Sequence, residues 1–188
     1  MISKMIANYY RKTELLSEHK IECMEYAMSA LENEISKLLM FSIAFGVLGF
    51  WEQFLLSYIV FVSIRAFAGG IHCKTYWQCT LVSMLMFSTC VFLADLCSES
   101  VKLLFVIALV SIVFPLMLSP MTPSFRIIKT DNHKWLLKTL AVLLSVGWIM
   151  FACIIINNKI LSTTIMITVS VVNYQLVIPA MLHFKRRR

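Results

Sequence analysis

Between two long apolar runs the chain reads Arg65-Ala66-Phe67-Ala68-Gly69-Gly70-Ile71-His72-Cys73-Lys74-Thr75-Tyr76-Trp77-Gln78-Cys79. This polar stretch holds two of the five glycines and two of the six cysteines. Glycine takes positive φ readily and weakens a helix, so Gly69-Gly70 should end the helix before it. Thr75 and Gln78 have the spacing of a capping box, which predicts that a second helix begins beside Thr75. The stretch therefore predicts a break between two apolar helices, with Cys79 near the start of the second.

Cys79 and His72 are the candidate reactive pair of this stretch. The dipole of a helix favours a thiolate near the helix N-terminus, and an imidazole can serve as its base. In one straight helix the two residues would lie about 10 Å apart along the axis, which is too far for proton transfer. The glycine pair and the cap instead predict a turn in which His72 folds back towards Cys79. The simpler alternative makes Cys79 a packing residue and His72 a hydrogen-bonded polar group.

The composition of the whole chain is that of an integral membrane protein. Of its 188 residues, 60% are hydrophobic and 14% are charged, and the mean hydropathy is +0.81. Soluble domains are at most about half apolar. We therefore expect residues 1–188 to form a single all-α membrane domain. The net charge of +7 does not indicate nucleic-acid binding, because the basic residues lie between apolar spans and not on one soluble face.

The sequence predicts about six transmembrane helices within residues 37–184. The apolar segments are residues 37–51, 54–64, 80–96, 103–118, 136–156 and 160–182. The first two are short for a crossing, which takes about 20 residues, unless they extend to residues 35 and 67. A tight outer turn at Glu52-Gln53 is expected to join them, with a re-entrant hairpin as the alternative.

The two ends of the chain differ from the apolar bundle. Residues 1–36 repeat apolar side chains at helical spacing and predict amphipathic helices at the membrane surface or against the bundle. Residues 185–188 form a basic tail. With six crossings, 15 of the 17 Lys and Arg residues fall on one side, and only Lys102 and Lys159 fall on the other. Because positive loops stay in the cytoplasm, both termini and Cys79 are predicted to be cytoplasmic.

The chain resembles the AgrB-type accessory gene regulator proteins of Gram-positive bacteria. The pattern R-x-x-x-G-G-x-H-x-x-x-x-x-x-C from Arg65 to Cys79 carries the likeness. Trp77-Gln78-Cys79-Thr80, the proline-containing basic loop at residues 119–138, the chain length and the basic C-terminus add to it. The resemblance implies a membrane cysteine endopeptidase that removes the C-terminal tail of an AgrD-type precursor. It also implies that the enzyme closes a thiolactone or lactone ring of a quorum-sensing peptide, with Cys79 as nucleophile and His72 as base.

Other residues are predicted to support this chemistry. Arg65 can pair with a substrate carboxylate or orient a loop carbonyl, and the alternative is that it reaches lipid phosphates. Gly69 and Gly70 are expected to shape the turn, and Arg65 and Gly70 match family motif positions. Three basic residues are candidate contacts for an acidic precursor tail, although they also suit an ordinary role in topology: Arg126, Lys129 and Lys134.

Three other classes of function stay open. Asn173 and Gln175 in the last span can line the polar path of a transporter or peptide exporter. A metalloenzyme would use His72, His133 and a cysteine, but the chain has no HExxH motif and no zinc spacing of its cysteines. The third class is a non-catalytic scaffold of a sensor complex. The cysteine peptidase interpretation requires no metal and no cofactor, and it leaves a homodimer open.

Overall fold

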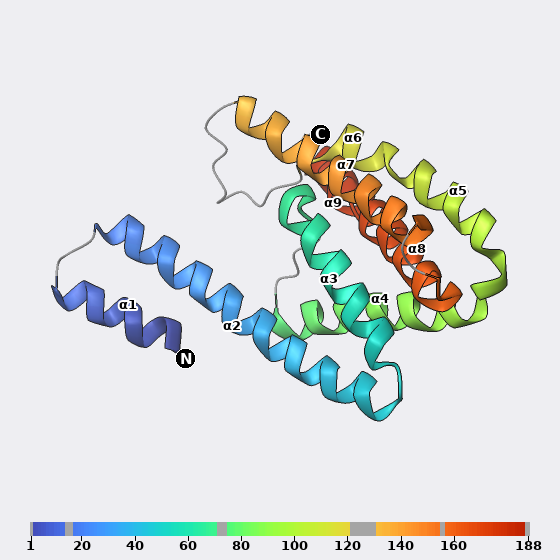
Figure 1. Ribbon diagram of the computed structural model, residues 1–188. Coiled ribbons are helices and arrows are strands. Elements are labelled where there is room, and N and C mark those ends of the chain that lie inside the picture. Colours follow the sequence, from blue (N-terminus) through green and yellow to red (C-terminus); the bar gives the residue numbers. More distant parts are fainter. Residues whose placement is uncertain (1, 14–16, 71–74, 121–130, 155–156, 187–188) are drawn as a thin grey trace. The chain divides into compact units, whose positions relative to one another are not determined.

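The computed structural model describes residues 2–13, 17–70, 75–120, 131–154 and 157–186 (Figure 1). The elements in these ranges are helical, which confirms the predicted all-α fold. They are α1 (Ile2–Thr13), α2 (Glu18–Val47), α3 (Trp51–Ala68), α4 (Tyr76–Leu96), the 3-10 turn η1 (Ser98–Ser100), α5 (Val101–Ser111), α6 (Val113–Leu118), α7 (Asp131–Ile154), α8 (Lys159–Tyr174) and α9 (Val177–Arg186). The chain divides into two compact units, Met1–Leu48 and Gly49–Arg188.

The first unit is a hairpin in which α1 runs antiparallel to α2 (Figure 1). Arg11, near the end of α1, donates to Glu18 at 2.8 Å and to Glu25 at 3.3 Å. At the start of α1 the backbone N–H of Ser3 donates to Glu32 at 2.6 Å. Large apolar side chains of the unit remain exposed, as expected for amphipathic helices: Met5, Tyr9, Tyr26, Leu31, Ile35, Leu39 and Ile43.

Among the described residues of the second unit, five helical segments are long and apolar enough to cross a membrane. They are Trp51–Ala68, Tyr76–Leu96, Ser98–Leu118, Asp131–Ile154 and Lys159–Met181. The first predicted span, residues 37–51, is not among them. Most of it belongs to α2, whose last 18 residues still carry Glu32, Glu34 and Lys37, and charged side chains oppose insertion. The five segments confirm the membrane bundle without the sixth span that the sequence predicts.

The turn before α3 lies at Leu48–Phe50, so the turn predicted at Glu52-Gln53 is wrong. Gly49 has a φ of 79°, a left-handed value that glycine adopts without the steric penalty of a Cβ. Glu52 instead lies in the first turn of α3, where its negative charge is favoured by the positive end of the helix dipole. The polar pair Glu52-Gln53 therefore belongs to the start of a helix and not to a loop.

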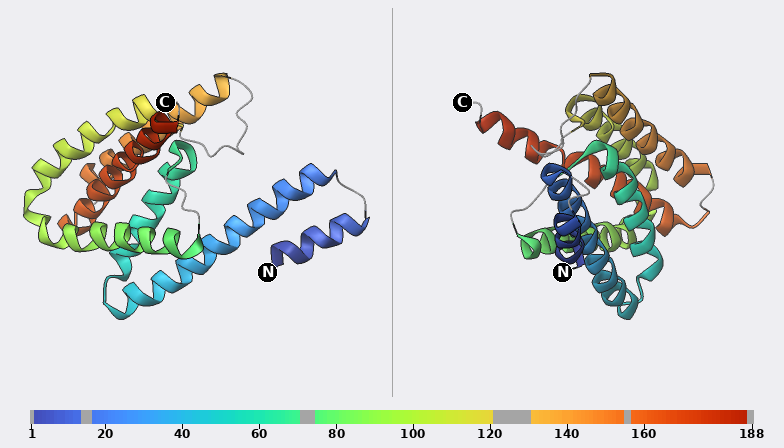
Figure 2. Two further views of the ribbon diagram at one scale, coloured as in Figure 1. Left: turned by 180° about the vertical axis from the view of Figure 1, so that it is seen from behind. Right: turned by 90° about the vertical axis from the view of Figure 1, so that its left-hand side faces the viewer.

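α8 is the central helix of the second unit. In the most apolar 18 residues of the Lys159–Met181 segment 72% are buried, whereas the corresponding share in the other four segments is at most 33%. α8 packs against α3, α4, α5 and α7, and it is drawn in orange-red in both views of Figure 2. Its buried Asn173 donates to Ser111 of α5 at 3.1 Å and accepts from Ser145 of α7 at 3.4 Å. Asn173 thus links α8 to α5 and α7 by hydrogen bonds. Because its amide is used in these contacts, the assignment of Asn173 to a transport path is weakened.

Candidate active site

α3 ends at the glycine pair, as the sequence predicts. Ala68 is the last helical residue, and the N–H of Gly69 donates to the carbonyl oxygen of Arg65 at 3.0 Å. Gly69 has φ 82° and ψ −161°, a backbone region that is essentially restricted to glycine. Any residue with a Cβ would therefore be strained at position 69, where the chain leaves α3.

This backbone conformation predicts a large effect of a small substitution. Gly69→Ala should lower the free energy of unfolding by about 1–3 kcal/mol, because alanine is strained in this region. Gly147→Ala is the matched control, since Gly147 lies within α7 and a Cβ there would meet no atom within 4 Å. That control should instead stabilise the protein by about 0.5–1 kcal/mol, because alanine is the better helix former. Thermal unfolding of both variants in detergent measures the difference, and a Gly69→Ala protein as stable as wild type would contradict the assigned backbone conformation.

Gly70 is buried and lies against two polar side chains. A Cβ on Gly70 would come within 3.2 Å of Nε and 3.4 Å of Cζ of Arg65, and within 3.5 Å of Nε2 of Gln175. The absence of a side chain therefore lets the guanidinium pack closely against the glycine turn. Cζ of Arg65 also lies 5.2 Å from the ring centroid of Phe61, within the range of a cation–π contact. These contacts favour a role for Arg65 inside the protein over an outward one at lipid phosphates.

Cys79 lies in the first turn of α4. The side-chain oxygen of Thr75 accepts a hydrogen bond from the N–H of Gln78 at 3.3 Å, which confirms Thr75 as the N-cap. The N–H of Cys79 donates to the carbonyl oxygen of Thr75 at 3.1 Å. The side chain of Cys79 is partly exposed and is not part of a disulfide. The thiol therefore lies near the N-terminal, positive end of the dipole of α4.

Several predicted site residues lie outside the described residues, namely His72, Arg126 and Lys129. The proposed fold-back of His72 towards Cys79 therefore stays a prediction. Lys134 is described, on the first turn of α7, where it pairs with Asp131 at 3.0 Å and remains about half exposed. This is an ordinary surface ion pair, and the role of Lys134 towards a precursor tail also stays a prediction.

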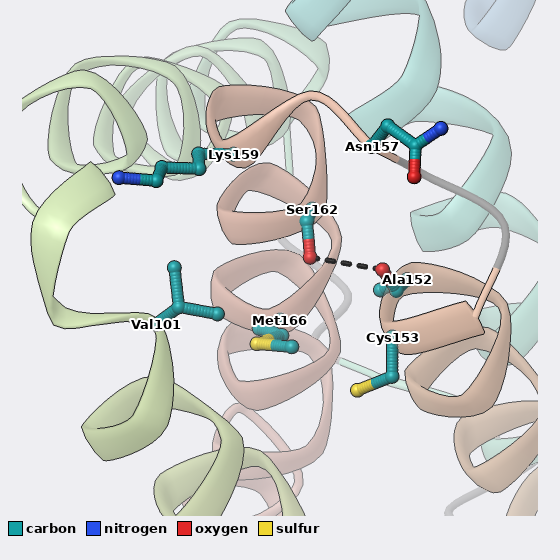
Figure 3. Close-up of a pocket in the computed structure, with 7 residues that line it drawn as sticks. All are labelled: Val101, Ala152, Cys153, Asn157, Lys159, Ser162 and Met166. Carbon is teal, nitrogen blue, oxygen red and sulfur yellow. Dashed lines mark hydrogen bonds between the residues drawn. The ribbon is translucent and has the colours of Figure 1, made fainter.

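The pocket in Figure 3 lies near the start of α8 and does not contain the site. It has a volume of about 240 Å³. Gln175, which lies beside Gly70 at the end of α3, is about 20 Å along the helix axis from Ser162 in this pocket. The pocket is lined by Val101, Ala152, Cys153, Asn157, Lys159, Ser162 and Met166, none of which is a predicted site residue. We therefore locate the candidate site at the end of α3 and the start of α4.

Two comparisons with known proteins point to the same family. The sequence profile described as Accessory gene regulator B (AgrB) matches residues 3–178. A curated relative, a putative AgrB-like protein from Clostridium beijerinckii, is 27% identical over 150 residues, which cover 79% of this chain and 74% of the relative. No solved structure matches the chain. The chain therefore belongs to the AgrB family of accessory gene regulator proteins.

Proposed function

We propose that this chain is a membrane cysteine endopeptidase that processes an AgrD-type precursor peptide. It cleaves the C-terminal tail of the precursor and closes the remaining peptide into a thiolactone or lactone ring. Membership of the AgrB family supports a role in the accessory gene regulator system and links the chain to peptide processing. The observation that carries the chemistry is the partly exposed thiol of Cys79 in the capped first turn of α4.

The chemistry proceeds through a covalent intermediate. His72 takes the proton from Sγ of Cys79, and the thiolate attacks a peptide carbonyl carbon of the precursor. The peptide C–N bond breaks, His72 returns the proton to the leaving amine, and the tail departs. The remaining peptide is held on Cys79 as a thioester.

Ring closure follows from this thioester. An internal thiol or hydroxyl of the peptide attacks the carbonyl carbon, the C–S bond to Cys79 breaks, and the enzyme thiol is restored. Exchange between two thioesters is nearly isoenergetic, so closure competes with hydrolysis where water is scarce. The five apolar segments of the second unit support a location at a membrane, where water is limited.

A location of the active site at the cytoplasmic face is part of the proposal. It rests on the 15 Lys and Arg residues that six crossings would collect on one side, against Lys102 and Lys159 on the other. Reporter fusions after Glu99 and after Asn158 should report an external location, and a fusion after Lys129 should report a cytoplasmic one. A fusion near the N-terminus decides whether residues 37–51 add a crossing to the five apolar segments. An external reading at Lys129 would overturn the proposed side of the active site.

The proposed function is tested by the products that the chain makes from its precursor. The chain and the precursor, taken from the small open reading frame beside the gene, are co-expressed and the peptides are analysed by mass spectrometry. A cyclic peptide and a released tail support the endopeptidase. Intact linear precursor outside the cell would instead favour an exporter, and intact precursor inside would favour a scaffold.

A further inference from the structure

Gln175 is a buried side chain whose amide has no partner in the described ranges of the chain. It follows α8 and precedes α9, so it lies at the interruption of the last apolar segment. Only 4% of the residue is exposed, and neither Nε2 nor Oε1 has a hydrogen-bond partner there. A buried polar group without a partner destabilises a folded protein. The nearby Asn173, in contrast, has a hydrogen-bond partner at both ends of its amide.

The amide of Gln175 lies at the glycine turn of the candidate site. A Cβ on Gly70 would be 3.5 Å from its Nε2 and 3.2 Å from Nε of Arg65. The next helix in the chain, α4, carries Cys79. The carboxamide of Gln175 and the guanidinium of Arg65 therefore lie together beside Gly70, at the end of α3. The predicted reactive stretch includes this turn.

The chemistry of this group selects its ligand. A carboxamide presents one acceptor and one donor side by side, which matches the C=O and N–H of a peptide main chain. A carboxylate would accept from Nε2 but would leave Oε1 unpaired, because an ionised carboxylate has no donor. Arg65 carries donors alone, so it adds hydrogen bonds to a carbonyl oxygen and none to an N–H. Both atoms of the Gln175 amide are thus satisfied together by peptide main chain.

We propose that Gln175 is a substrate-binding residue whose side-chain amide pairs with main-chain peptide groups of the precursor, beside Arg65 and Gly70. This inference rests on the proposed function, since the bound chain is the precursor peptide. In this role Gln175 recognises the main chain of the precursor and not a particular side chain. The residue adds affinity, and the bond-breaking chemistry stays with Cys79 and His72.

Binding is measured in a Cys79→Ala background, which separates recognition from cleavage. The probe is the synthetic full-length precursor carrying a fluorophore, titrated against the protein in detergent. Gln175→Met keeps the shape of the side chain and removes both polar atoms. It should weaken binding about tenfold, as expected for the loss of hydrogen bonds to one buried amide. Gln53→Met, at the other end of α3, is the matched control and should bind as tightly as the parent.

A set of precursors with single ester bonds separates direct contact from a structural effect. Each ester replaces one main-chain N–H by oxygen, and the ester at the contacted position should weaken binding to the parent but not to Gln175→Met. A purely structural role would lower the affinity of all precursors alike and would overturn the proposal. If Gln175→Met does not fold, Gln175→Glu serves instead, because it lacks the N–H donor and should bind about tenfold more weakly.

The remaining outcomes distinguish the two proposals. Unchanged affinity of the folded Gln175 variants overturns the role of Gln175 and leaves the proposed function intact. If ordered water satisfies the amide instead of the peptide, every ester precursor should bind the parent and the Gln175 variant with the same relative affinity. That result also overturns the role of Gln175 and leaves the proposed function intact. Failure of the Cys79→Ala parent to bind the precursor removes both the subsite and the proposed substrate.

Discussion

We expect Cys79→Ala to abolish cleavage of the precursor while the protein still inserts into the membrane. Alanine has no atom that can attack the carbonyl or hold the peptide as a thioester, so the loss should be at least about 10³-fold. The fold should tolerate the change, because the side chain is partly exposed and the cap of α4 is made by Thr75. Loss of the precursor and appearance of the tail, followed by mass spectrometry in membranes, give the rate.

Cys73→Ala is the matched control for this experiment. It removes a second thiol of the same stretch, which the family pattern does not assign as nucleophile, and it should retain activity. Equal amounts of both variants in the membrane fraction exclude a failure of expression. The reverse result, an active Cys79→Ala and an inactive Cys73→Ala, would show that the nucleophile is misassigned.

The parts of the fold that follow from local rules could be predicted from the sequence. The end of α3 at Gly69 and the start of α4 after Thr75 were both predicted, because a positive φ and a side-chain cap depend on a few neighbouring residues. The all-α character followed from apolar runs long enough to satisfy their own backbone in a membrane. These rules also placed Cys79 near the start of its helix.

The features that depend on distant residues could not be predicted. Gln175 lies beside Gly70, although more than 100 residues separate them in sequence, and no spacing rule links the two. Asn173 and Gln175 look alike as polar residues of one span, but the structure gives partners to the first and none, within the part it describes, to the second. The turn at Gly49 was missed because Glu52 was interpreted as a loop residue instead of the start of a helix. Tertiary packing decided the first two cases, whereas the turn at Gly49 depends on local features that were misinterpreted.

The second large effect concerns the covalent intermediate. Incubation with precursor should give an adduct on Cys79 that carries the N-terminal part of the peptide and is removed by hydroxylamine, because a thioester reacts with amines and an amide does not. His72→Ala should prevent the adduct from forming, since an unassisted thiol at neutral pH is only a few per cent thiolate. Intact-protein mass spectrometry before and after hydroxylamine measures the adduct. Cys79→Ala, which should give no adduct, is the control for labelling elsewhere.

The fate of the intermediate distinguishes ring formation from simple hydrolysis. A precursor whose ring-forming residue is replaced by alanine should still be cut, because attack by Cys79 does not use that residue. Its product should stay on the enzyme or leave as a linear peptide, since no internal nucleophile is available to break the thioester. Chelators should change neither step, which separates this mechanism from a metal-dependent one. A normal cyclic product from that precursor, or cleavage with no adduct on Cys79, would contradict a thioester as the common intermediate of cleavage and cyclisation.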